Sequence, residues 1–211
     1  MMTVVPYKGS NPKSRLSALL SEGEREIFAR CMLHDVLKIL EESDAFEIVI
    51  LAKTLEMGLE DMDLFLNEKD LNEALNEILV RMKEPLLIVM PDLPLIKKYH
   101  INEILSREED VVISPGRRGG TNILFLRKPS EFIVDYHGAS YLDHLAIAEE
   151  KGLNVGTYDS FFVSSDIDET EDLIELFIHG DGAKLQSLNY LKELGIVLKI
   201  DGDGFSIKRE V

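Results

Sequence analysis

Residues 4–16 read VVPYKGSNPKSRL, and the rest of the chain is arranged around this stretch. Its apolar start breaks into a loop that carries Lys8, Lys13 and Arg15 within eight positions of an otherwise acidic chain. A strand that opens into a cationic loop and then a helix is typical of α/β enzymes that bind phosphates. The loop contains neither GxxxxGK[ST] nor GxGxxG, so two interpretations stay open: a phosphate-binding loop, or a solvated surface loop with ordinary basic residues.

Composition bounds the class of protein. With 211 residues, 45% of them hydrophobic, the chain is long enough for one large domain with a real core, or one domain with a small appendage. The single cysteine, Cys31, allows no disulfide within the chain, which predicts a reducing, cytoplasmic location. No apolar run approaches the roughly 18 residues of a membrane span, so we expect no membrane association. A net charge of −16 argues against nucleic-acid binding but not against a small phosphorylated ligand.

Apolar runs alternate with stretches of helical periodicity along most of the chain. We predict strands at residues 1–6, 46–52, 63–66, 85–90, 110–114, 122–126 and 153–158. We predict helices at residues 21–42, 70–83, 96–107, 140–151 and 169–179. Ser21 followed by Glu24 is a capping-box pattern that sets the start of the first of these helices. The alternation predicts an α/β fold with a mainly parallel central sheet and helices on both faces.

The last segment has a different pattern. An amphipathic helix is expected over residues 183–194, followed by two alternating runs around Asp201, Gly202, Asp203 and Gly204 that indicate a β-hairpin. We therefore divide the chain into a main domain over residues 1–180 and a C-terminal appendage over residues 181–211, packed on the same domain. The appendage either completes the sheet or makes a contact in a homodimer.

Three aspartates are candidate metal ligands. Asp92 directly follows the predicted strand at residues 85–90, and ligands of open α/β sheets lie at the carboxyl ends of strands. Asp166 and Asp168 are two positions apart, so on an extended segment their carboxylates point the same way. Together they could form a three-carboxylate magnesium site, because Mg²⁺ prefers carboxylate and phosphate oxygens. The alternative is that Asp92 caps the next helix and that Asp166 and Asp168 belong to a helix N-terminus.

Two loops are candidate sites for an anionic substrate. Residues 115–121 contain glycines that let the backbone approach a ligand, and Arg117 can pair with phosphate or carboxylate oxygens. Thr121 and Asn122 add neutral polar contacts, unless the loop is only a charged turn between two strands. Ser140, shortly after Gly138, is expected to be the N-cap of a helix whose free N–H groups could accept an anion.

These residues belong to six segments that follow one another in a recognisable order. The segments are Pro6-x-Lys8…Lys13-Ser14-Arg15-Leu16, Leu71-Asn72-Glu73-Ala74-Leu75, Pro91-Asp92-Leu93-Pro94-Leu95, Gly120-Thr121-Asn122, Ser140-Tyr141-x-x-His144 and Asp166-Ile167-Asp168-Glu169-Thr170-Glu171-Asp172-Leu173. The set resembles the 2-phospho-L-lactate guanylyltransferases of coenzyme F-420 biosynthesis, within the glycosyltransferase-A-like nucleotidyltransferases. The resemblance covers about residues 3–178.

The resemblance implies a nucleotide-diphospho-sugar transferase-like, Rossmann-like fold and the transfer of GMP from GTP to the phosphate of 2-phospho-L-lactate. It implies the following roles: Lys8, Lys13, Arg15 and Asp92 in catalysis; Pro6, Lys8, Lys13, Ser14, Arg15, Asn72 and Pro91 in nucleotide binding; Arg117, Thr121, Asn122, Gly138 and Ser140 in substrate binding; and Asp92, Asp166 and Asp168 in holding Mg²⁺. His137 and Ala139 stand where the family commonly has glycine, so phosphoenolpyruvate and phosphoglycerate stay open as acceptors.

Two further hypotheses remain beside this one. The chain could transfer a nucleotide to another acceptor, such as molybdopterin or a sugar phosphate, or it could be a non-catalytic nucleotide-binding regulator. The presence of all three aspartates and both lysines disfavours the regulator. The loops at residues 117–122 and 137–140 would separate the two enzymes, because they would contact the acceptor.

Overall fold

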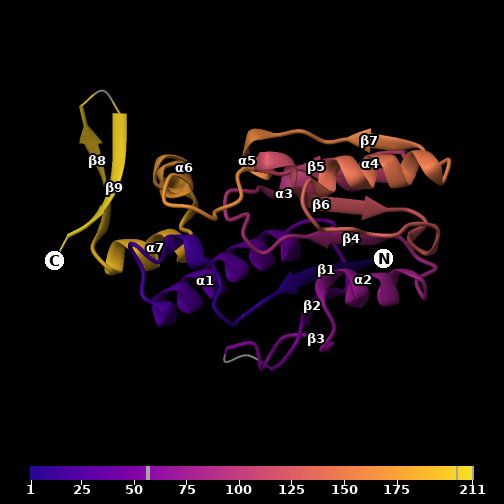
Figure 1. Cartoon of the computed structure of the whole chain (residues 1–211), viewed down its shortest axis with the longest axis horizontal. Helices are drawn as coiled ribbons and strands as arrows, with labels where there is room; N and C mark the ends of the chain where they lie inside the picture. The colour runs from indigo at the N-terminus through magenta and orange to yellow at the C-terminus, as the bar shows by residue number, and fades with distance from the viewer. Residues whose placement is uncertain (56–57, 203, 211) are drawn as a thin grey trace.

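A seven-stranded sheet organises the molecule in a computed structural model that describes residues 1–55, 58–202 and 204–210 (Figure 1). The strands are β1 Met2–Tyr7, β2 Ile48–Ala52, β3 Leu64–Leu66, β4 Leu86–Val89, β5 Val111–Pro115, β6 Thr121–Leu126 and β7 Val155–Thr157, with β8 Ile196–Asp201 and β9 Gly204–Arg209 in a separate hairpin. The helices are α1 Glu22–Glu41, α2 Leu71–Leu79, α3 Lys98–Ser106, α4 Ser140–Glu150, α5 Phe161–Ser164, α6 Asp172–His179 and α7 Gln186–Glu193. Short 3-10 turns lie at Ser14–Leu16, Arg117–Gly119, Pro129–Glu131 and Asp181–Ala183.

The order of the strands is β3-β2-β1-β4-β6-β5-β7. All neighbouring pairs are parallel except those of β6, which runs antiparallel to both β4 and β5. β1 lies between β2 and β4, and Val4 is in register with Val49 on one side and Ile88 on the other. The predicted α/β fold with a mainly parallel sheet is thus confirmed, and its first strand is central.

The two faces of the sheet carry separate hydrophobic cores. Side chains alternate across a strand, so Leu87 and Val89 of β4 pack with α1, α3 and α7, whereas Leu86 and Ile88 pack with α2 and α4. All four are buried, as expected for a strand covered on both faces. The helices therefore lie on both faces, as the sequence predicts.

The start of α1 follows its sequence signal. Ser21 is the N-cap: its hydroxyl accepts the N–H of Glu24, and the Glu24 carboxylate accepts the N–H of Ser21. The hydrogen bond from Arg209 of β9 is the largest cause that lowers the pKa of Glu24 to about 2, followed by the bond from the Ser21 N–H. This capping box follows the 3-10 turn at Ser14–Leu16 and fixes where α1 begins.

The segment between β7 and α6 differs from its prediction. Residues 161–164 form the short helix α5, and α6 begins at Asp172, three residues later than expected. The reason is the side chain of Asp172, whose Oδ2 accepts the N–H groups of Asp168 and Glu169 and closes a turn before the helix. The acidic run thus forms a capped turn as well as a helix start.

The C-terminal appendage packs on α1 and does not join the sheet. The Asp35 carboxylate of α1 accepts the N–H groups of Gln186 and Ser187 at the start of α7, and Arg209 of β9 forms an ion pair with Glu24. β8 and β9 pair only with each other, so completion of the sheet, one of the two expected roles, is wrong. The hairpin itself is as predicted, although Asp203 of its turn lies outside the described residues.

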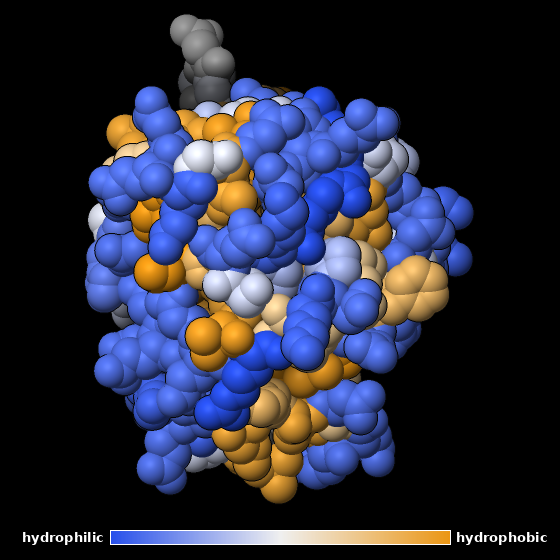
Figure 2. Space-filling view, turned by 90° about the vertical axis from the view of Figure 1, so that its right-hand side faces the viewer, coloured by the Kyte–Doolittle hydropathy of each residue, from blue (hydrophilic) through white to orange (hydrophobic). Residues whose placement is uncertain are grey.

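The surface shows no large uniform patch at the end of the molecule where the chain begins. Figure 2 shows mainly hydrophilic side chains there, with apolar ones gathered in smaller areas that include the lower edge. None of the helices within the described residues combines the length and apolar character needed to cross a membrane.

Candidate active site

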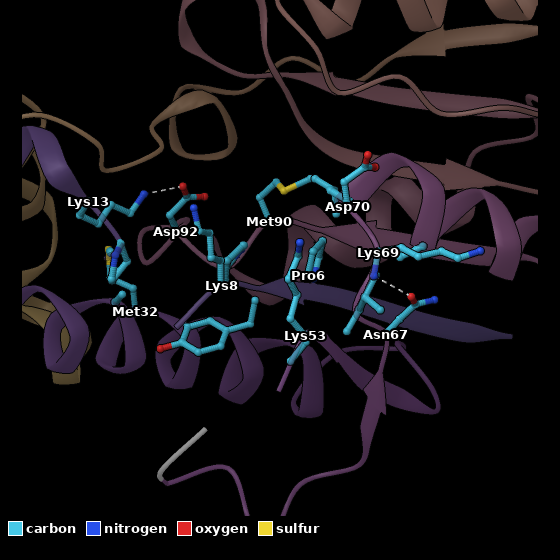
Figure 3. Close-up of a pocket in the computed structure, with 18 of the residues that line it drawn as sticks. Pro6, Lys8, Lys13, Met32, Lys53, Asn67, Lys69, Asp70, Met90 and Asp92 are labelled. Atoms are coloured by element: carbon cyan, nitrogen blue, oxygen red, sulfur yellow. Dashed lines mark hydrogen bonds and ion pairs between the residues drawn. The ribbon is translucent and has the colours of Figure 1, made fainter. Parts of the chain in front are cut away.

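The carboxyl ends of β1, β2, β3 and β4 surround a cavity of about 430 Å³ (Figure 3). Its apolar part comes from Met32 of α1, Leu71 of α2 and Met90 after β4. Its charged part comes from four lysines and three aspartates: Lys8, Lys13, Lys53, Lys69, Asp70, Asp92 and Asp168. A cavity with an apolar part and several lysines at the carboxyl edge of an open sheet suits a nucleotide, which has a flat base and a polyanionic tail.

The basic loop after β1 has an unusual backbone. Asn11 and Lys13 adopt the left-handed conformation with φ of 44° and 51°, which costs about 1 kcal/mol or more for a residue other than glycine. This conformation precedes the 3-10 turn and directs the Lys13 side chain into the cavity (Figure 3). Its Nζ lies 2.6 Å from Asp92 Oδ2 and 2.6 Å from Asp168 Oδ1. The predicted loop, the end of β4 and the acidic turn before α6 thus meet at one ammonium group.

The pKa values of these groups reflect that contact. Burial works against charge on Lys13, but the charges of Asp92 and Asp168 outweigh it, so the pKa of the ammonium is raised. Burial also works against charge on Asp168, yet Lys13 holds its pKa below the usual range. The pKa of Asp166 is raised, first by burial and then by the negative charge of Asp92. Burial and the neighbouring carboxylate of Asp92 thus both work against charge on Asp166.

The three aspartates have the carboxylate donors that Mg²⁺ prefers, and Asp166 hydrogen-bonds to the loop that carries Arg117. Asp92 is also tied to the acidic segment through its carbonyl, which accepts the N–H of Ile167 at 3.0 Å. Within residues 1–55, 58–202 and 204–210, however, no three acidic, histidine or cysteine side chains are already grouped for a metal ion. Lys13 lies between Asp92 and Asp168, and Asp166 accepts hydrogen bonds from Asn122 and the Arg117 N–H. The three-carboxylate magnesium site stays a prediction.

Two lysines of the cavity are missing from the sequence prediction. Lys53 follows β2 directly, and Lys69 lies beyond the end of β3. Lys69 pairs with Glu77, whereas Lys8 and Lys53 have no ion pair within the described part of the chain. The signal for Lys53 was its position at the carboxyl end of a predicted strand, the same signal that identified Asp92. Among the lysines of the cavity, Lys8 and Lys53 are therefore the ones that make no ion pair with a described residue and could meet an anion.

Some residues predicted to bind the nucleotide do line the cavity and others do not. Pro6 and Pro91 line it. Arg15 lies outside the lining, with its guanidinium 3.7 Å from Asp168 Oδ2 and 3.5 Å from Glu169 Oε1. Ser14 is exposed at the start of the 3-10 turn.

Asn72 is engaged elsewhere. Its amide oxygen accepts the N–H of Tyr136, and its amide N–H groups contact Asp135 and His137. It thus ties the start of α2 to the segment before α4, beside Leu71, which does line the cavity.

The residues expected to bind the acceptor form a second region next to the first. Arg117 donates to Asp172 at 2.8 Å through its guanidinium and to Asp166 through its backbone N–H. Asn122 is buried, with its amide donating to Val163 O and Asp166 Oδ1. Gly116 makes this possible, since a Cβ there would lie 2.2 Å from Asn122 Oδ1. Asp166 therefore connects this region to the cavity.

The start of α4 closes the second region. Ser140 donates its hydroxyl to Thr121 Oγ1 at 3.2 Å, so it is not the N-cap of α4; Ala139 holds that position without a side-chain cap. Gly138 is exposed and has a left-handed φ of 57°. Thr121 also contacts His144 Nδ1 at 2.9 Å, while His144 Nε2 accepts the N–H of Asp135. Since Nε2 is an acceptor, the imidazole is neutral and its proton lies on Nδ1.

His144 predicts a pH dependence of stability. Burial lowers its pKa to about 4, from the ordinary value of 6.5. The unfolded chain therefore binds this proton at a higher pH than the folded protein does, and stability falls as the pH drops from 6.5 to 4. The loss from this one group is on the order of 3 kcal/mol. Urea unfolding at several pH values measures the slope, which His144→Gln is expected to reduce; the control is pH 7.5, where His144 is neutral in both states. An unchanged slope in the variant contradicts the assignment.

Comparison with solved structures identifies the class of fold. A Desulfovibrio desulfuricans G20 protein assigned as a nucleotide-diphospho-sugar transferase matches with a TM-score of 0.73 at 17% identity, covering 91% of this chain and 94% of the other. A nucleotidyl transferase from Methanothermobacter matches with a TM-score of 0.59 at 13% identity, covering 92% and 99%. The fold is thus that of the nucleotide-diphospho-sugar transferases, with its cavity at the carboxyl edge of the sheet.

The sequence narrows the class to a family. The chain belongs to the family described as "Guanylyl transferase CofC like", whose model matches residues 1–210. It is 50% identical to 2-phospho-L-lactate guanylyltransferase of Methanosarcina barkeri over 186 residues, covering 87% of this chain and 89% of the relative. It is 41% identical to the protein of that name from Methanocella arvoryzae, covering 100% of this chain and 94% of the relative. The resemblance drawn from the six segments is confirmed.

Proposed function

We propose that the protein transfers GMP from GTP to the phosphate of 2-phospho-L-lactate or a similar phospho-acid in coenzyme F-420 biosynthesis. The products are lactyl-2-diphospho-5'-guanosine and pyrophosphate. The observation that carries the proposal is the meeting of Lys13, Asp92 and Asp168 beside the cavity, in a chain 50% identical to a 2-phospho-L-lactate guanylyltransferase. The charges of the cavity support a nucleoside triphosphate: Lys8 and Lys53 are free for its phosphates.

The reaction exchanges one bond to phosphorus for another. An oxygen of the acceptor phosphate forms a bond to the α-phosphorus of GTP, and the bond from that phosphorus to the bridging oxygen breaks. Pyrophosphate leaves with the electron pair, and lysines of the cavity neutralise its charge. The acceptor oxygen is already anionic, so no general base is required, and positioning and charge neutralisation supply most of the rate enhancement. His144 does not act as a general base in this mechanism, because both its ring nitrogens make hydrogen bonds within the protein.

Asp92, Asp166 and Asp168 are the residues that would hold Mg²⁺. When bound, Mg²⁺ supplies positive charge beside the phosphate oxygens, which reduces their mutual repulsion. If these carboxylates held Mg²⁺, the ammonium group of Lys13, which pairs with Asp92 and Asp168, would be available to the triphosphate. Arg15, which lies beside Asp168 and Glu169, would extend the positive rim toward the leaving pyrophosphate.

The acceptor would lie in the second region. Asp166 contacts the backbone of Arg117, so a phosphate bound beside Arg117 would lie close to the aspartates. Thr121 and Ser140 contribute hydroxyl groups there, and the left-handed Gly138 leaves room above the start of α4. Arg117 is engaged with Asp172 and would have to share its guanidinium with the carboxylate or phosphate of the acceptor.

A matrix of substrates tests the proposal. The protein is incubated with Mg²⁺, each of the four nucleoside triphosphates, and a panel of 2-phospho-L-lactate, phosphoenolpyruvate, phosphoglycerate and a sugar phosphate. Pyrophosphate release is the readout. We expect the fastest release with GTP and a phospho-acid; faster release with the sugar phosphate favours the other enzyme hypothesis. If no combination releases pyrophosphate, both enzyme hypotheses are wrong for this chain.

Lys53 provides a separate prediction, because the sequence analysis did not name it and its place in the cavity lining comes from the structure. Lys53→Ala removes one of the two unpaired cations of the cavity, so we expect the KM for GTP to rise about five- to tenfold. The KM for the acceptor should change little. The matched control is Lys38→Ala, which removes an exposed lysine from the last turn of α1. Equal KM values for GTP in the wild type and Lys53→Ala would remove Lys53 from the nucleotide site.

A further inference from the structure

We infer that Arg25 is a positioning residue that holds the basic loop in the conformation from which Lys13 reaches the cavity. Arg25 is on the first turn of α1, yet its side chain turns back under the loop and is only 7% exposed. It lies outside the cavity lining. The expected effect on GTP binding rests on the proposed function. The role of Arg25 in the position of the loop does not.

The guanidinium makes three hydrogen bonds, and two of them go to the loop. Nε donates to Pro12 O at 3.2 Å, and Nη2 donates to Asn11 Oδ1 at 2.8 Å. Nη1 donates to Leu20 O at 3.1 Å, just before the N-cap of α1. A planar fork with fixed N–H directions can bind these three diverging acceptors, which a lysine cannot.

The contacts fall where the backbone is strained. Asn11 and Lys13 both have positive φ, and Pro12 lies between them. Strained conformations persist where the surrounding structure fixes them. By binding the Pro12 carbonyl and the Asn11 side chain together, Arg25 stabilises both left-handed residues at once.

The charge of Arg25 supports the same role. Within the described residues no carboxylate lies within ion-pair distance of it, so a buried guanidinium is satisfied by neutral oxygens alone. A buried cation without a counter-ion is costly, and a position that needed only packing would be served better by an apolar residue. We therefore assign the guanidinium the role of holding the loop in shape through its hydrogen bonds to Pro12 O and Asn11 Oδ1.

The test uses two variants of the full chain and one control. Arg25→Lys keeps the charge but loses the fork. Asn11→Gly removes one acceptor while glycine accepts the positive φ without strain, so this variant is expected to fold even if the first does not. The control is Arg209→Lys, because Arg209 contacts Glu24 in the first turn of α1 and Leu19 O just before it, and no hydrogen bond joins it to the loop within the described residues.

The first readout needs no substrate. Lys13 is 10% exposed and paired with two carboxylates, so an amine-reactive reagent should label it slowly relative to the exposed Lys8. We expect labelling of Lys13, measured by mass spectrometry against Lys8, to be about tenfold faster in Arg25→Lys and faster in Asn11→Gly. Arg209→Lys should match the wild type. Unchanged labelling of Lys13 in a folded Arg25→Lys, or in Asn11→Gly where Arg25→Lys does not fold, overturns the inference.

The second readout is kinetic. We expect the KM for GTP to rise about tenfold in Arg25→Lys, with the KM for the phospho-acid unchanged and Arg209→Lys like the wild type. Equal increases in both KM values, or none, in an active protein overturn the inference, because a general loss of structure is not selective for GTP. If the wild type transfers no GMP, the proposed function fails, and the labelling experiment alone decides the position of the loop.

Discussion

Asp92→Asn is expected to lower the rate of GMP transfer about 1000-fold while the protein stays folded. Asp92 lies at the carboxyl end of the central strand β4, lines the cavity and faces Lys13 at 2.6 Å. The variant keeps the size of the side chain and removes only its charge. It therefore removes one of the three carboxylates proposed for Mg²⁺, which we propose lie beside the two reacting phosphates.

The controls separate chemistry from folding. Circular dichroism and thermal unfolding should show that Asp92→Asn is folded, since Asp92 is part of the cavity surface and not of either hydrophobic core. Asp44→Asn, which changes an exposed carboxylate after α1, should leave the rate unchanged. A wild-type rate in Asp92→Asn would remove Asp92 from the reaction.

Lys13→Met is expected to reduce turnover to a similar extent and, unlike Asp92→Asn, to destabilise the ligand-free protein. Without the ammonium group, Asp92 and Asp168 lose the cation that lies 2.6 Å from each, and Asp166 adds a third carboxylate nearby. Removing one partner of a buried ion pair commonly costs about 3–5 kcal/mol. Because Lys13 is 10% exposed, we expect a loss toward the lower end of that range.

The effect of Mg²⁺ on the melting temperature tests whether Lys13 and the metal share ligands. In the wild type Lys13 competes with a cation for the same carboxylates, so Mg²⁺ should raise the melting temperature of Lys13→Met by more than that of the wild type. Lys8→Met is the matched control, since Lys8 lines the cavity but has no ion pair within the described residues, and its stability should not change. If Mg²⁺ stabilises the wild type and Lys13→Met equally, Lys13 does not share ligands with the metal.

Local signals in the sequence predicted most of the fold. The capping box at Ser21 and Glu24 placed the start of α1, and the dense apolar run at residues 85–90 placed β4. The direction of β6 could not be predicted, because a strand buried on both faces reads the same in either direction and all six of its residues are buried. The late start of α6 depends on a side chain, Asp172, that bonds back to the chain before it.

Two signals in the sequence led to candidate site residues: a position directly after a predicted strand, and a place in one of the segments that resemble the family. Asp92 and Lys8, predicted from their place after strands, line the cavity, and the family itself is confirmed. Lys53 also follows a predicted strand, but that signal alone did not place it in the cavity, because its position there depends on β2 lying beside β1, which the chain order does not reveal. Arg117 was predicted to bind the substrate, and its pairing with Asp172 was not predicted, because the two residues are 55 positions apart and only the folded structure brings them together.

The central claim is that the α-phosphate of GTP moves to a phospho-acid at this site. GTP labelled with ³²P at the α-phosphate, incubated with Mg²⁺ and 2-phospho-L-lactate, tests it most directly. We expect the label to appear in lactyl-2-diphospho-5'-guanosine, the pyrophosphate to be unlabelled, and neither product to form without the acceptor. Label in free GMP, or GTP consumption that does not depend on the phospho-acid, would contradict GMP transfer to the acceptor.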